Sequence, residues 1–567
     1  MLADRNMALV RLSDEQFDLV VIGGGITGAC VAYDAAMRGL RVALVEKNDF
    51  GSATSASSSK LLHGGIRYLQ SLRIGKVRES ANERIFFQNI APHLCRYIPF
   101  LIPAFHGLTT NKLALRSALL VYGLAAVGQN RAARLPESRV PPPRIITDQE
   151  LLEQIPWLES RSDLCGGAEL PECHMINSER MTLSVISGAV ENGCLAVNYA
   201  VATNIESRAG KVRSLTIKDG ESGDEIEIRT RLVANCAGPW IGSVNQSALR
   251  GGRNPVTSVS RGSHLVLRGL NLTSALGLPT GQAIEGVAGR GGRHMFLIPW
   301  RDHVLLGTSY SAHDRSMDRV EPTVDDARQL VDGMNSAVGK RVIGPENLAY
   351  AYSGLYPLTT DSVKEGVYQG TGDYQIIDHA DADSVSGLYS VFGAKFTTAR
   401  LVAEKACDRM LPMLEGTFSR CETRTKAVQA GAFDSLARLV AELNDKYQSL
   451  VDVADIESLA RMYGTEAEEV LEIIKSKPGL GRRVSAERET LRAEAVFAAR
   501  SEMLVHLSDF VFRRTGLGTI GDPGIEVIRD CAKLIGEELG WSAPRSESEI
   551  GAVIRQFDVV EEIRASL

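Results

Sequence analysis

The sequence of 567 residues lacks the patterns that mark several common classes of protein. Its nine cysteines include no C-x-x-C pair and no cysteine–histidine cluster at zinc spacing, which argues against a metal site and against a disulfide framework. The net charge is -6 at pH 7, whereas proteins that bind nucleic acids normally carry a basic surface. We therefore expect neither a bound metal nor a nucleic-acid partner.

Long apolar runs are also missing, since none reaches the roughly 18 to 20 residues that cross a bilayer. The longest run, 117–128 (SALLVYGLAAVG), follows Lys112 and Arg116. A buried helix is the simpler interpretation of this run, and a helix lying on a membrane surface is the alternative. Residues 1–16 do not have the basic-then-apolar build of a secretory signal. We interpret them as a loose leader on a cytoplasmic protein, with a peripheral position on the inner face of the cytoplasmic membrane left open.

The composition, 44% hydrophobic and 23% charged, is that of a globular protein, and the length predicts two or three domains. A short apolar run at 17–22 (FDLVVI) predicts a strand, 27–39 has helical spacing, and 41–45 (RVALV) predicts a second strand. Together these three segments predict one βαβ unit at the N-terminus.

A glycine-rich turn, 23–28 (GGGITG), joins the first predicted strand to the helix. In such a turn Gly23 permits the tight backbone, Gly25 lets the chain approach a pyrophosphate, and Gly28 allows close packing of the helix. The helix N-terminus presents N–H groups to the phosphates. Glu46 ends the second strand, close to the position about 20 residues further on where an acid binds a ribose hydroxyl. The unit therefore predicts a dinucleotide site, without separating NAD from FAD.

Elements further along the chain divide it into domains. Apolar strands at 232–236 and 387–392 end at glycines and are expected to return to the first domain, and 263–267, 294–299 and 303–308 predict an antiparallel sheet. Charged amphipathic helices follow at 435–446, 455–463, 466–475, 493–512 and 524–538, after a polar linker at 422–431.

The fold class is therefore expected to be α/β. We expect a discontinuous Rossmann-like nucleotide-binding domain, an antiparallel-sheet substrate domain and an all-helical C-terminal domain. Their expected boundaries are, in that order, 15–75 with 145–250 and 350–421, then 76–144 with 251–349, then 432–567.

Residues 54–69 (TSASSSKLLHGGIRYL) resemble the signature of the FAD-dependent glycerol-3-phosphate dehydrogenases. A run of small and hydroxyl-bearing residues of this kind can wrap an extended pyrophosphate and ribityl chain. The likeness covers nearly the whole chain. It continues through 235–240 (NCAGPW), 261–264 (RGSH), 296–300 (FLIPW), 306–308 (LGT), 391–398 (VFGAKFTT) and 502–515 (EMLVHLSDFVFRRT).

The resemblance implies a flavoenzyme of glycerol metabolism with FAD as its cofactor. Such an enzyme oxidises a secondary alcohol, sn-glycerol 3-phosphate, to a ketone, dihydroxyacetone phosphate, by hydride transfer to flavin N5. The electrons pass on to a quinone or, in oxidase relatives, to oxygen. We thus expect a polyol phosphate or related small molecule as substrate, and leave a membrane surface and a homodimer open as further partners.

The resemblance also implies roles for particular residues. His264, Arg67 and Lys395 are the catalytic candidates: His264 to take the hydroxyl proton, since imidazole titrates near the working pH, and Lys395 to stabilise the reduced flavin. A framework role for His264 and His63 is an equal alternative. The substrate-binding candidates are Tyr68, Arg293 and Tyr356. The cofactor-binding candidates are Gly23, Gly25, Thr27, Gly28, Glu46, Lys47, Ser57, Ser58, Lys60, His63, Gly64, Ala237, Gly238, Gly393, Lys395 and Thr397.

Three positions depart from the family pattern, all in the expected substrate pocket. The arginine of A-Y-x-G-x-R-P-L is Tyr356, the basic residue of T-R-D-Y is Gly372, and the acid of G-T-T-D is Tyr310. Arginine binds phosphate through a bidentate fork that tyrosine cannot reproduce. Each such contact contributes roughly 1.5 to 3 kcal/mol, so a phosphate substrate should bind more weakly unless other cations compensate. The candidates for this are Arg67, Arg261, Arg293 and Lys395.

Three functions follow from these observations. The first is a glycerol-3-phosphate dehydrogenase proper, and the second is the same flavin chemistry on a different hydroxy or amino substrate. The third, of another class, is a flavin-binding module without turnover. The presence of His63, Arg67, His264 and Lys395 counts against the third.

Overall fold

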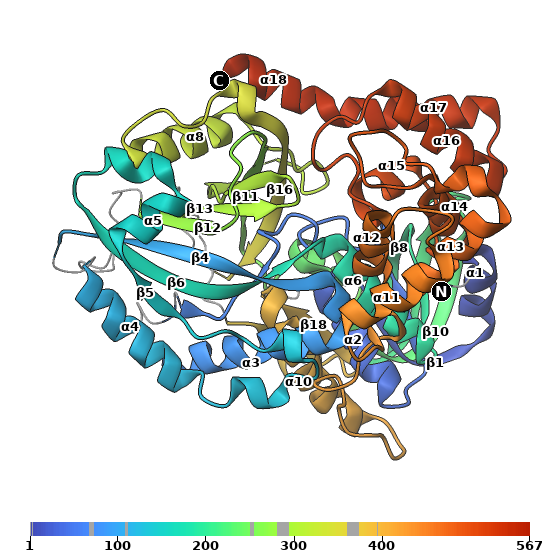
Figure 1. Cartoon of the computed structure of the whole chain (residues 1–567). Coiled ribbons are helices and arrows are strands. Elements are labelled where there is room, and N and C mark those ends of the chain that lie inside the picture. The colour runs from blue at the N-terminus through green and yellow to red at the C-terminus, as the bar shows by residue number, and fades with distance from the viewer. Residues whose placement is uncertain are drawn as a thin grey trace.

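In the part of the chain that it describes, the computed structural model contains two β-sheets and a domain of helices (Figure 1). Three residues singled out above, Arg67, Arg293 and Gly372, lie outside the part of the chain that the structure describes. The described residues are 2, 4–66, 68, 73–107, 111–249, 254–279, 294–313, 315–359, 373–393 and 395–567.

The first sheet contains the predicted βαβ unit. Leu19, Val20 and Val21 are all 0% exposed, so both faces of β1 are covered, as its apolar sequence predicts. The parallel strands lie in the order β18 (Leu388–Phe392), β10 (Glu225–Asn235), β1 (Gln16–Ile22), β2 (Val42–Val45), β7 (Leu195–Val197). The antiparallel additions are β17 (Gln375–Asp378), β9 (Lys211–Asp219) and β8 (Ala200–Arg208).

Helices cover this sheet. The connecting helix α2 (Ile26–Met37) packs against β1 and β2 and lies beside α6 (Ser178–Glu191) and α10 (Ala399–Met410). The predicted return of 232–236 and 387–392 to the first domain is confirmed, because β10 and β18 pair beside β1.

The second sheet is mainly antiparallel, and its pairing of β11, β13 and β14 confirms the predicted antiparallel strands. Its main path is β15 (Ser311–Ala312), β11 (Ser258–Leu267), β14 (His303–Gly307), β13 (His294–Trp300), β12 (Ala275–Pro279), β4 (Cys95–Phe105), β6 (Leu164–Met175), β3 (Leu61–Leu62). Off this path, β16 (Leu348–Leu358) pairs with β11 and β5 (Arg144–Ile146) with β6. The helices beside it are α3 (Ile74–Ile90), α4 (Lys112–Ala125), α5 (Asp148–Gln154) and α8 (Val324–Val338).

Two strands correct the expected domain boundaries. β6 lies within 145–250, and all of β16 except its first two residues lies within 350–421. We assigned both ranges to the nucleotide-binding domain, yet both strands belong to the second sheet. β6 pairs with β4 and β16 pairs with β11 along nearly their whole lengths. An alternating or apolar sequence predicts that a strand forms but carries no information about which sheet it joins.

The N-terminal residues are also corrected, because they form a helix and are not a loose leader. Asp4 caps α1 (Arg5–Asp14), and Ala8 and Leu12 are fully buried. The Arg5 guanidinium pairs with the Asp219 carboxylate and donates to two backbone carbonyls. Ala8, Leu9 and Leu12 lie at helical spacing, but the mixed charges in the same window obscure this pattern in the sequence.

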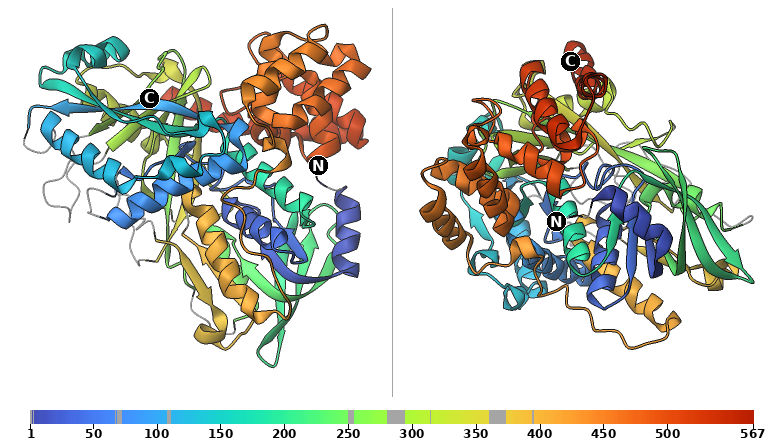
Figure 2. Two further views of the ribbon diagram at one scale, coloured as in Figure 1. Left: turned by 60° about the horizontal axis from the view of Figure 1, so that its bottom comes forward. Right: turned by 90° about the vertical axis from the view of Figure 1, so that its right-hand side faces the viewer.

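The apolar run at 117–128 lies in a surface helix, so the buried-helix interpretation is wrong. α4 packs against β4, β5 and β6 and buries only Leu119 and Tyr122. The left view of Figure 2 places it on the outside of the molecule, away from the helical domain. Within the described residues, no helix combines the length and the apolar character needed to cross a membrane.

The C-terminal domain is helical, as expected. The predicted helix 493–512 is wrong as a single element, because it ends at Ser501 and a new turn begins where Asp509 accepts from the backbone N–H groups of Val505 and His506. The helices are α11 (Leu436–Tyr447), α12 (Val453–Tyr463), α13 (Ala467–Ser476), α14 (Arg492–Ser501), α15 (Leu507–Asp509), α16 (Ile525–Leu539), α17 (Ala543–Ile554) and α18 (Asp558–Ser566). A π-helical turn, Phe510–Arg514, follows α15.

Glu494, buried inside the helical domain, makes stability depend on pH. Its carboxylate accepts from the backbone N–H of Leu491 and from the Tyr463 hydroxyl, and burial raises its pKa from 4.5 to about 7. Because the folded-state pKa lies above the unfolded one, the protonated carboxyl stabilises the fold fully below about pH 4.5, and this contribution is lost as the pH rises through 7.

We therefore expect Glu494→Gln to reduce the fall in melting temperature between roughly pH 5 and pH 8. Thermal unfolding across this range measures the effect, and some slope should persist because burial also raises the pKa of Glu466 to about 7. Glu538→Gln, at a partly exposed ion pair with Arg500, is the control and should keep the parental slope. Equal slopes for Glu494→Gln and the parent would contradict the expectation.

Candidate active site at the junction of the two sheets

Two turns meet at the carboxyl ends of β1 and β10. Gly23 has a φ of +104°, and a Cβ placed on it would lie 2.8 Å from the carbonyl oxygen of Cys236. A Cβ on Gly28 would lie 1.9 Å from the carbonyl oxygen of Gly23, so no larger residue fits there without movement. Ala237 and Gly238 continue the second turn, and Gly238 has a φ of +56°. This is the edge of a parallel sheet where nucleotides bind.

The acid and the helix start predicted for a dinucleotide site lie beside these turns. Glu46 accepts from the backbone N–H of Gly24 at 2.6 Å and from that of Asn48 at 2.9 Å. Burial raises the pKa of Glu46, while these two N–H groups oppose the rise. The N-cap of α2 is Gly25, which has no side chain to cover the first turn that holds Thr27. A tight turn, a helix N-terminus whose N-cap residue has no side chain and a carboxylate together fit a pyrophosphate and a ribose.

Lys47 connects several elements at the edge of this region. Its ammonium lies 3.9 Å from the centroid of the Trp240 ring and pairs with the Asp318 carboxylate. The same carboxylate accepts from Trp240 Nε1 at 3.0 Å. Lys47 therefore joins the end of β2 to the second turn and to a segment of the second sheet's domain.

The serine-rich loop leads from the first sheet to the second and is anchored on β16. Thr54 Oγ1 donates to the Leu355 carbonyl and Ser57 Oγ to the Ser353 carbonyl, each at 2.7 Å. The Tyr352 hydroxyl donates to the carbonyl of Ser58 at 2.8 Å. Three hydrogen bonds, each from a side-chain hydroxyl to a backbone carbonyl, thus anchor the loop on β16.

Lys60, at the end of this loop, is expected to line the flavin, and in the structure its ammonium group is paired inside the protein. Its side chain is 1% exposed, and its ammonium donates to both carboxylate oxygens of Glu179 at 2.7 Å and to Ser178 Oγ at 3.0 Å. The charge of Lys60 is therefore matched inside the protein, where it ties the loop to the start of α6.

His264 projects from β11 next to this loop. Its Nε2 lies 2.9 Å from Ser59 Oγ and 3.1 Å from Thr308 Oγ1, and its ring stacks on Tyr352 with centroids 5.1 Å apart. Burial, together with the nearby Lys60 charge, lowers its pKa to about 3. The imidazole is therefore neutral at physiological pH, which differs from the expected titration near the working pH. Its Nδ1 is buried and has no hydrogen-bond partner among the described residues.

A third group of predicted residues lies where β18 ends. The backbone N–H of His63 donates to Thr397 Oγ1 at 3.2 Å, and the Lys395 ammonium lies 4.4 Å from the centroid of the Tyr68 ring. The Tyr356 hydroxyl donates to the carbonyl of Gly393 at 3.2 Å. The structure therefore brings predicted residues from distant segments into contact: His63 with Thr397, Tyr68 with Lys395, and Tyr356 with Gly393.

Two charged groups around this cluster are already paired. The backbone N–H of Gly64 donates to Glu172 at 2.8 Å, and that carboxylate also binds Arg84. Arg261, one of the cations expected to compensate for a lost phosphate anchor, forms an ion pair of 2.9 Å with buried Asp326. Its charge is thus used to hold the start of α8.

Several residues at the site were missed by sequence reasoning. Ser55 accepts from the backbone N–H of Ile26 at 2.8 Å, while Ser59, Thr308 and Tyr352 surround the His264 ring. All four lie inside the family motifs, so the sequence indicates that they are near the site. Their individual roles could not be predicted, because they depend on contacts between strands far apart in the chain.

Comparison with known proteins agrees with this geometry. Residues 18–409 match the family described as FAD dependent oxidoreductase, and residues 421–546 match the C-terminal domain of alpha-glycerophosphate oxidase. The chain belongs to the FAD-dependent glycerol-3-phosphate dehydrogenase family. It is an oxidoreductase with FAD as its cofactor, which confirms the resemblance drawn from the sequence motifs.

Curated members of this family match the chain along most of its length. Glycerol-3-phosphate dehydrogenase of Synechocystis sp. is 29% identical over 551 residues, 95% of this chain and 96% of that protein. Glycerol-3-phosphate dehydrogenase 1 of Mycobacterium tuberculosis is 33% identical over 528 residues, 91% of this chain and 95% of that protein.

Solved structures support the fold. The glycerol-3-phosphate dehydrogenase of Bacillus halodurans, complexed with FAD, matches with a TM-score of 0.77 at 24% identity, over 98% of this chain and 97% of that one. L-alpha-glycerophosphate oxidase of Mycoplasma pneumoniae, with FAD bound, matches with a TM-score of 0.53 at 16% identity, over 73% of this chain and 99% of that one. The predicted fold, with its helical C-terminal domain, is confirmed.

Proposed function

We propose that this enzyme oxidises sn-glycerol 3-phosphate to dihydroxyacetone phosphate and passes the electrons to a quinone. The observation that carries the proposal is the convergence of the family segments around His264, His63, Tyr356 and Lys395 in a chain related along its length to glycerol-3-phosphate dehydrogenases. FAD, when bound, accepts the hydride. The protein binds the substrate, orients it and handles the hydroxyl proton.

The residues take the following roles in this proposal. The glycine turn and the α2 N-terminus bind the pyrophosphate, and Glu46 binds the ribose. The loop 57–64 and the segment 393–397 enclose the flavin end of the cofactor. His264 is neutral and so can accept the hydroxyl proton, although its lowered pKa makes it a weaker base than an ordinary imidazole. Lys395 supplies positive charge as electrons arrive. Tyr68 and Tyr356 contact the substrate.

A different hydroxy or amino substrate is the second candidate, and two contacts favour it. Tyr356 stands where the family has an arginine and is bonded to the Gly393 carbonyl, and Arg261 is paired with Asp326. Neither supplies a bidentate anchor for a phosphate.

The exposed face of α4 supports a membrane-bound electron acceptor. Leu113, Leu120 and Leu124 on α4 and Val127 just beyond its end are each at least 67% exposed, and exposed apolar side chains gathered in one region mark interaction sites. A hollow of about 500 Å³ beside this face is lined by Lys112, Leu113, Arg116 and Ile145. An apolar face next to two cations fits an anionic membrane surface, from which a quinone is reached.

The proton-accepting role of His264 predicts a loss of the chemical step. His264→Asn should slow anaerobic flavin reduction by roughly 10² to 10⁴-fold while FAD stays bound, since a positioned base contributes about that much. Stopped-flow absorbance at saturating glycerol 3-phosphate measures the rate. His303→Asn, a largely buried histidine on neighbouring β14, is the matched control and should change it little. A His264→Asn rate within threefold of the parent favours the framework role.

Substitution of Tyr356 tests whether the substrate is a phosphate. Tyr356→Arg should raise kcat/KM for glycerol 3-phosphate by roughly tenfold or more, because it adds a charge-assisted contact to the phosphate. Tyr356→Phe removes the hydroxyl without adding charge and is the control. The parent enzyme is assayed in parallel by anaerobic flavin bleaching with polyol phosphates, hydroxy acids and amines. Bleaching by an uncharged substrate in preference to the phosphate identifies the second candidate, and no bleaching at all identifies a non-catalytic flavin-binding module.

The membrane surface is tested on α4. Leu120→Ser with Leu124→Ser should abolish most co-sedimentation with phosphatidylglycerol vesicles and leave the reduction of a soluble dye unchanged. Met7→Ser, at an equally exposed apolar residue on α1, is the control and should bind vesicles as the parent does. Unchanged co-sedimentation of the double variant excludes α4 as the docking face.

A further inference from the structure

A buried carboxylate joins the nucleotide-binding loop to the helical C-terminal domain. The Asp49 side chain is 0% exposed, and Arg514 binds it through two parallel contacts, Nη1 to Oδ2 at 2.7 Å and Nη2 to Oδ1 at 2.9 Å. Arg513 Nε donates to Oδ2 at 2.5 Å. Both arginines come from the π-helical turn Phe510–Arg514, more than 460 residues further along the chain.

The same loop presses on the glycine turn from the other side. Glu46 accepts from the backbone N–H of Gly24, and the backbone N–H of Gly51 donates to the Gly24 carbonyl at 3.0 Å. The Phe50 ring lies so close that a Cβ on Gly24 would be 2.8 Å from its Cδ1. A displacement of Asp49 would therefore move the residues that shape the turn.

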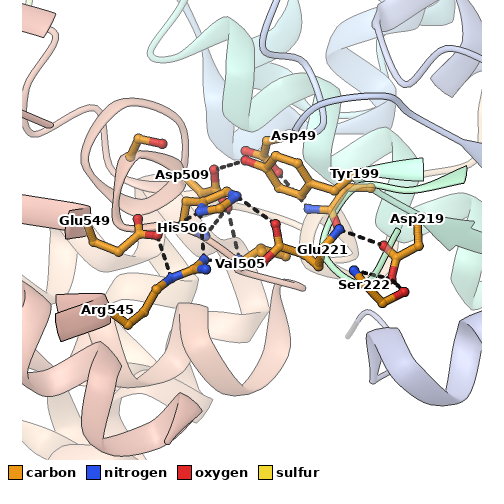
Figure 3. A network of polar contacts seen from close by, with 12 residues as sticks. Asp49, Tyr199, Asp219, Glu221, Ser222, Val505, His506, Asp509, Arg545 and Glu549 are labelled. Atoms are coloured by element: carbon orange, nitrogen blue, oxygen red, sulfur yellow. Dashed lines mark hydrogen bonds and ion pairs between the residues drawn. The ribbon is translucent and has the colours of Figure 1, made fainter. Parts of the chain in front are cut away.

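Neighbouring groups hold the arginines in place. Asp509 accepts from Arg513 Nη2 at 2.5 Å and from the Tyr199 hydroxyl at 2.6 Å, and the backbone N–H of Tyr199 donates to the carbonyl of Asn48 at 2.9 Å. Figure 3 shows Asp49 and Tyr199 facing Asp509 across this junction. The Arg513 guanidinium is thus oriented toward Asp49 by contacts within the protein.

The network continues to the outer edge of the junction. His506 lies between Glu549 at 2.9 Å and Glu221 at 3.2 Å, and Arg545 pairs with both of these carboxylates (Figure 3). Glu221 belongs to the β9–β10 turn, so the helical domain also contacts the first sheet there. These contacts hold the part of the helical domain that carries the π-helical turn against the first sheet.

Burial makes the charges at Asp49 interdependent. Burial alone would raise the pKa of Asp49, but Arg514 and Arg513 hold it below its ordinary value. Removing one partner of such a group leaves an uncompensated charge in the interior, and the loop must then move to reach water.

We propose that Arg513 and Arg514 are positioning residues for FAD. By pairing with Asp49 they hold the loop from Glu46 to Gly51 against the glycine turn, so that the adenosine half of the cofactor is bound fully only when the helical domain is seated. The inference rests on the FAD site proposed above and gives the C-terminal domain a part in cofactor binding.

The test measures cofactor affinity in the full-length protein after removal of its flavin. Asp49→Asn and Arg514→Met should each raise the dissociation constant for FAD, followed by quenching of flavin fluorescence, at least tenfold. ADP, which carries the adenosine half alone, should lose affinity in proportion, whereas FMN, which lacks it, should bind within twofold of the parent. Arg514→Lys keeps the charge and should recover part of the loss. Arg500→Met, at the partly exposed pair with Glu538, is the control in the same domain.

The outcomes distinguish failure of this inference from failure of the proposed FAD site. FAD and ADP affinities within twofold of the parent in folded Asp49→Asn overturn it, and so does an equal loss for FMN, which indicates general unfolding. If the buried variants do not fold, Arg513→Gln decides instead, because Arg514 still neutralises Asp49: at least a threefold loss for FAD and ADP is expected, and no loss overturns the proposal. Glu46→Gln tests the site itself. If it leaves FAD affinity unchanged, the location of the site is wrong, whatever Asp49 does.

Discussion

The parallel pairing of β1 with β10 is the constraint on which the rest of the site depends. It brings two backbone turns from distant parts of the chain into contact, Gly23 against Cys236, at a distance that excludes any side chain larger than hydrogen. The N-terminus of α2, with Gly25 as its N-cap, follows directly from the first turn, and the serine-rich loop is reached through the segment after β2. The position of the second sheet relative to the first is then fixed by that loop, which ends in β3 of the second sheet.

Features encoded within short segments could be predicted from the sequence. The glycine turn, the strands on either side of it and Glu46 lie within thirty or so residues, so their spacing alone specifies their geometry. Pairing between distant strands could not be predicted, which is why β6 and β16 were assigned to the wrong sheet. The helix α1 was missed for a different reason: its three buried residues are too few to stand out in a window with mixed charges.

The charged residues show where prediction of the site fails. Lys60 and Arg261 both lie in motifs typical of the family, and both were expected to serve ligands, yet each is matched by a carboxylate on another element, Glu179 and Asp326. A buried charge must be paired, and its partner is set by the tertiary fold. Sequence motifs therefore identify which cations are near a site, while the fold decides which of them remain available to a substrate.

The separation of Asp49 from Arg513 and Arg514 along the chain has a consequence for biosynthesis. Arg513 and Arg514 are synthesised 464 and 465 positions after Asp49. At the usual rates of about 5 to 20 residues per second, the carboxylate is made roughly 20 to 90 s before its counter-charges. The loop beside the glycine turn is thus completed only after the strands of both sheets have been synthesised, and under the proposal above the flavin is loaded only then.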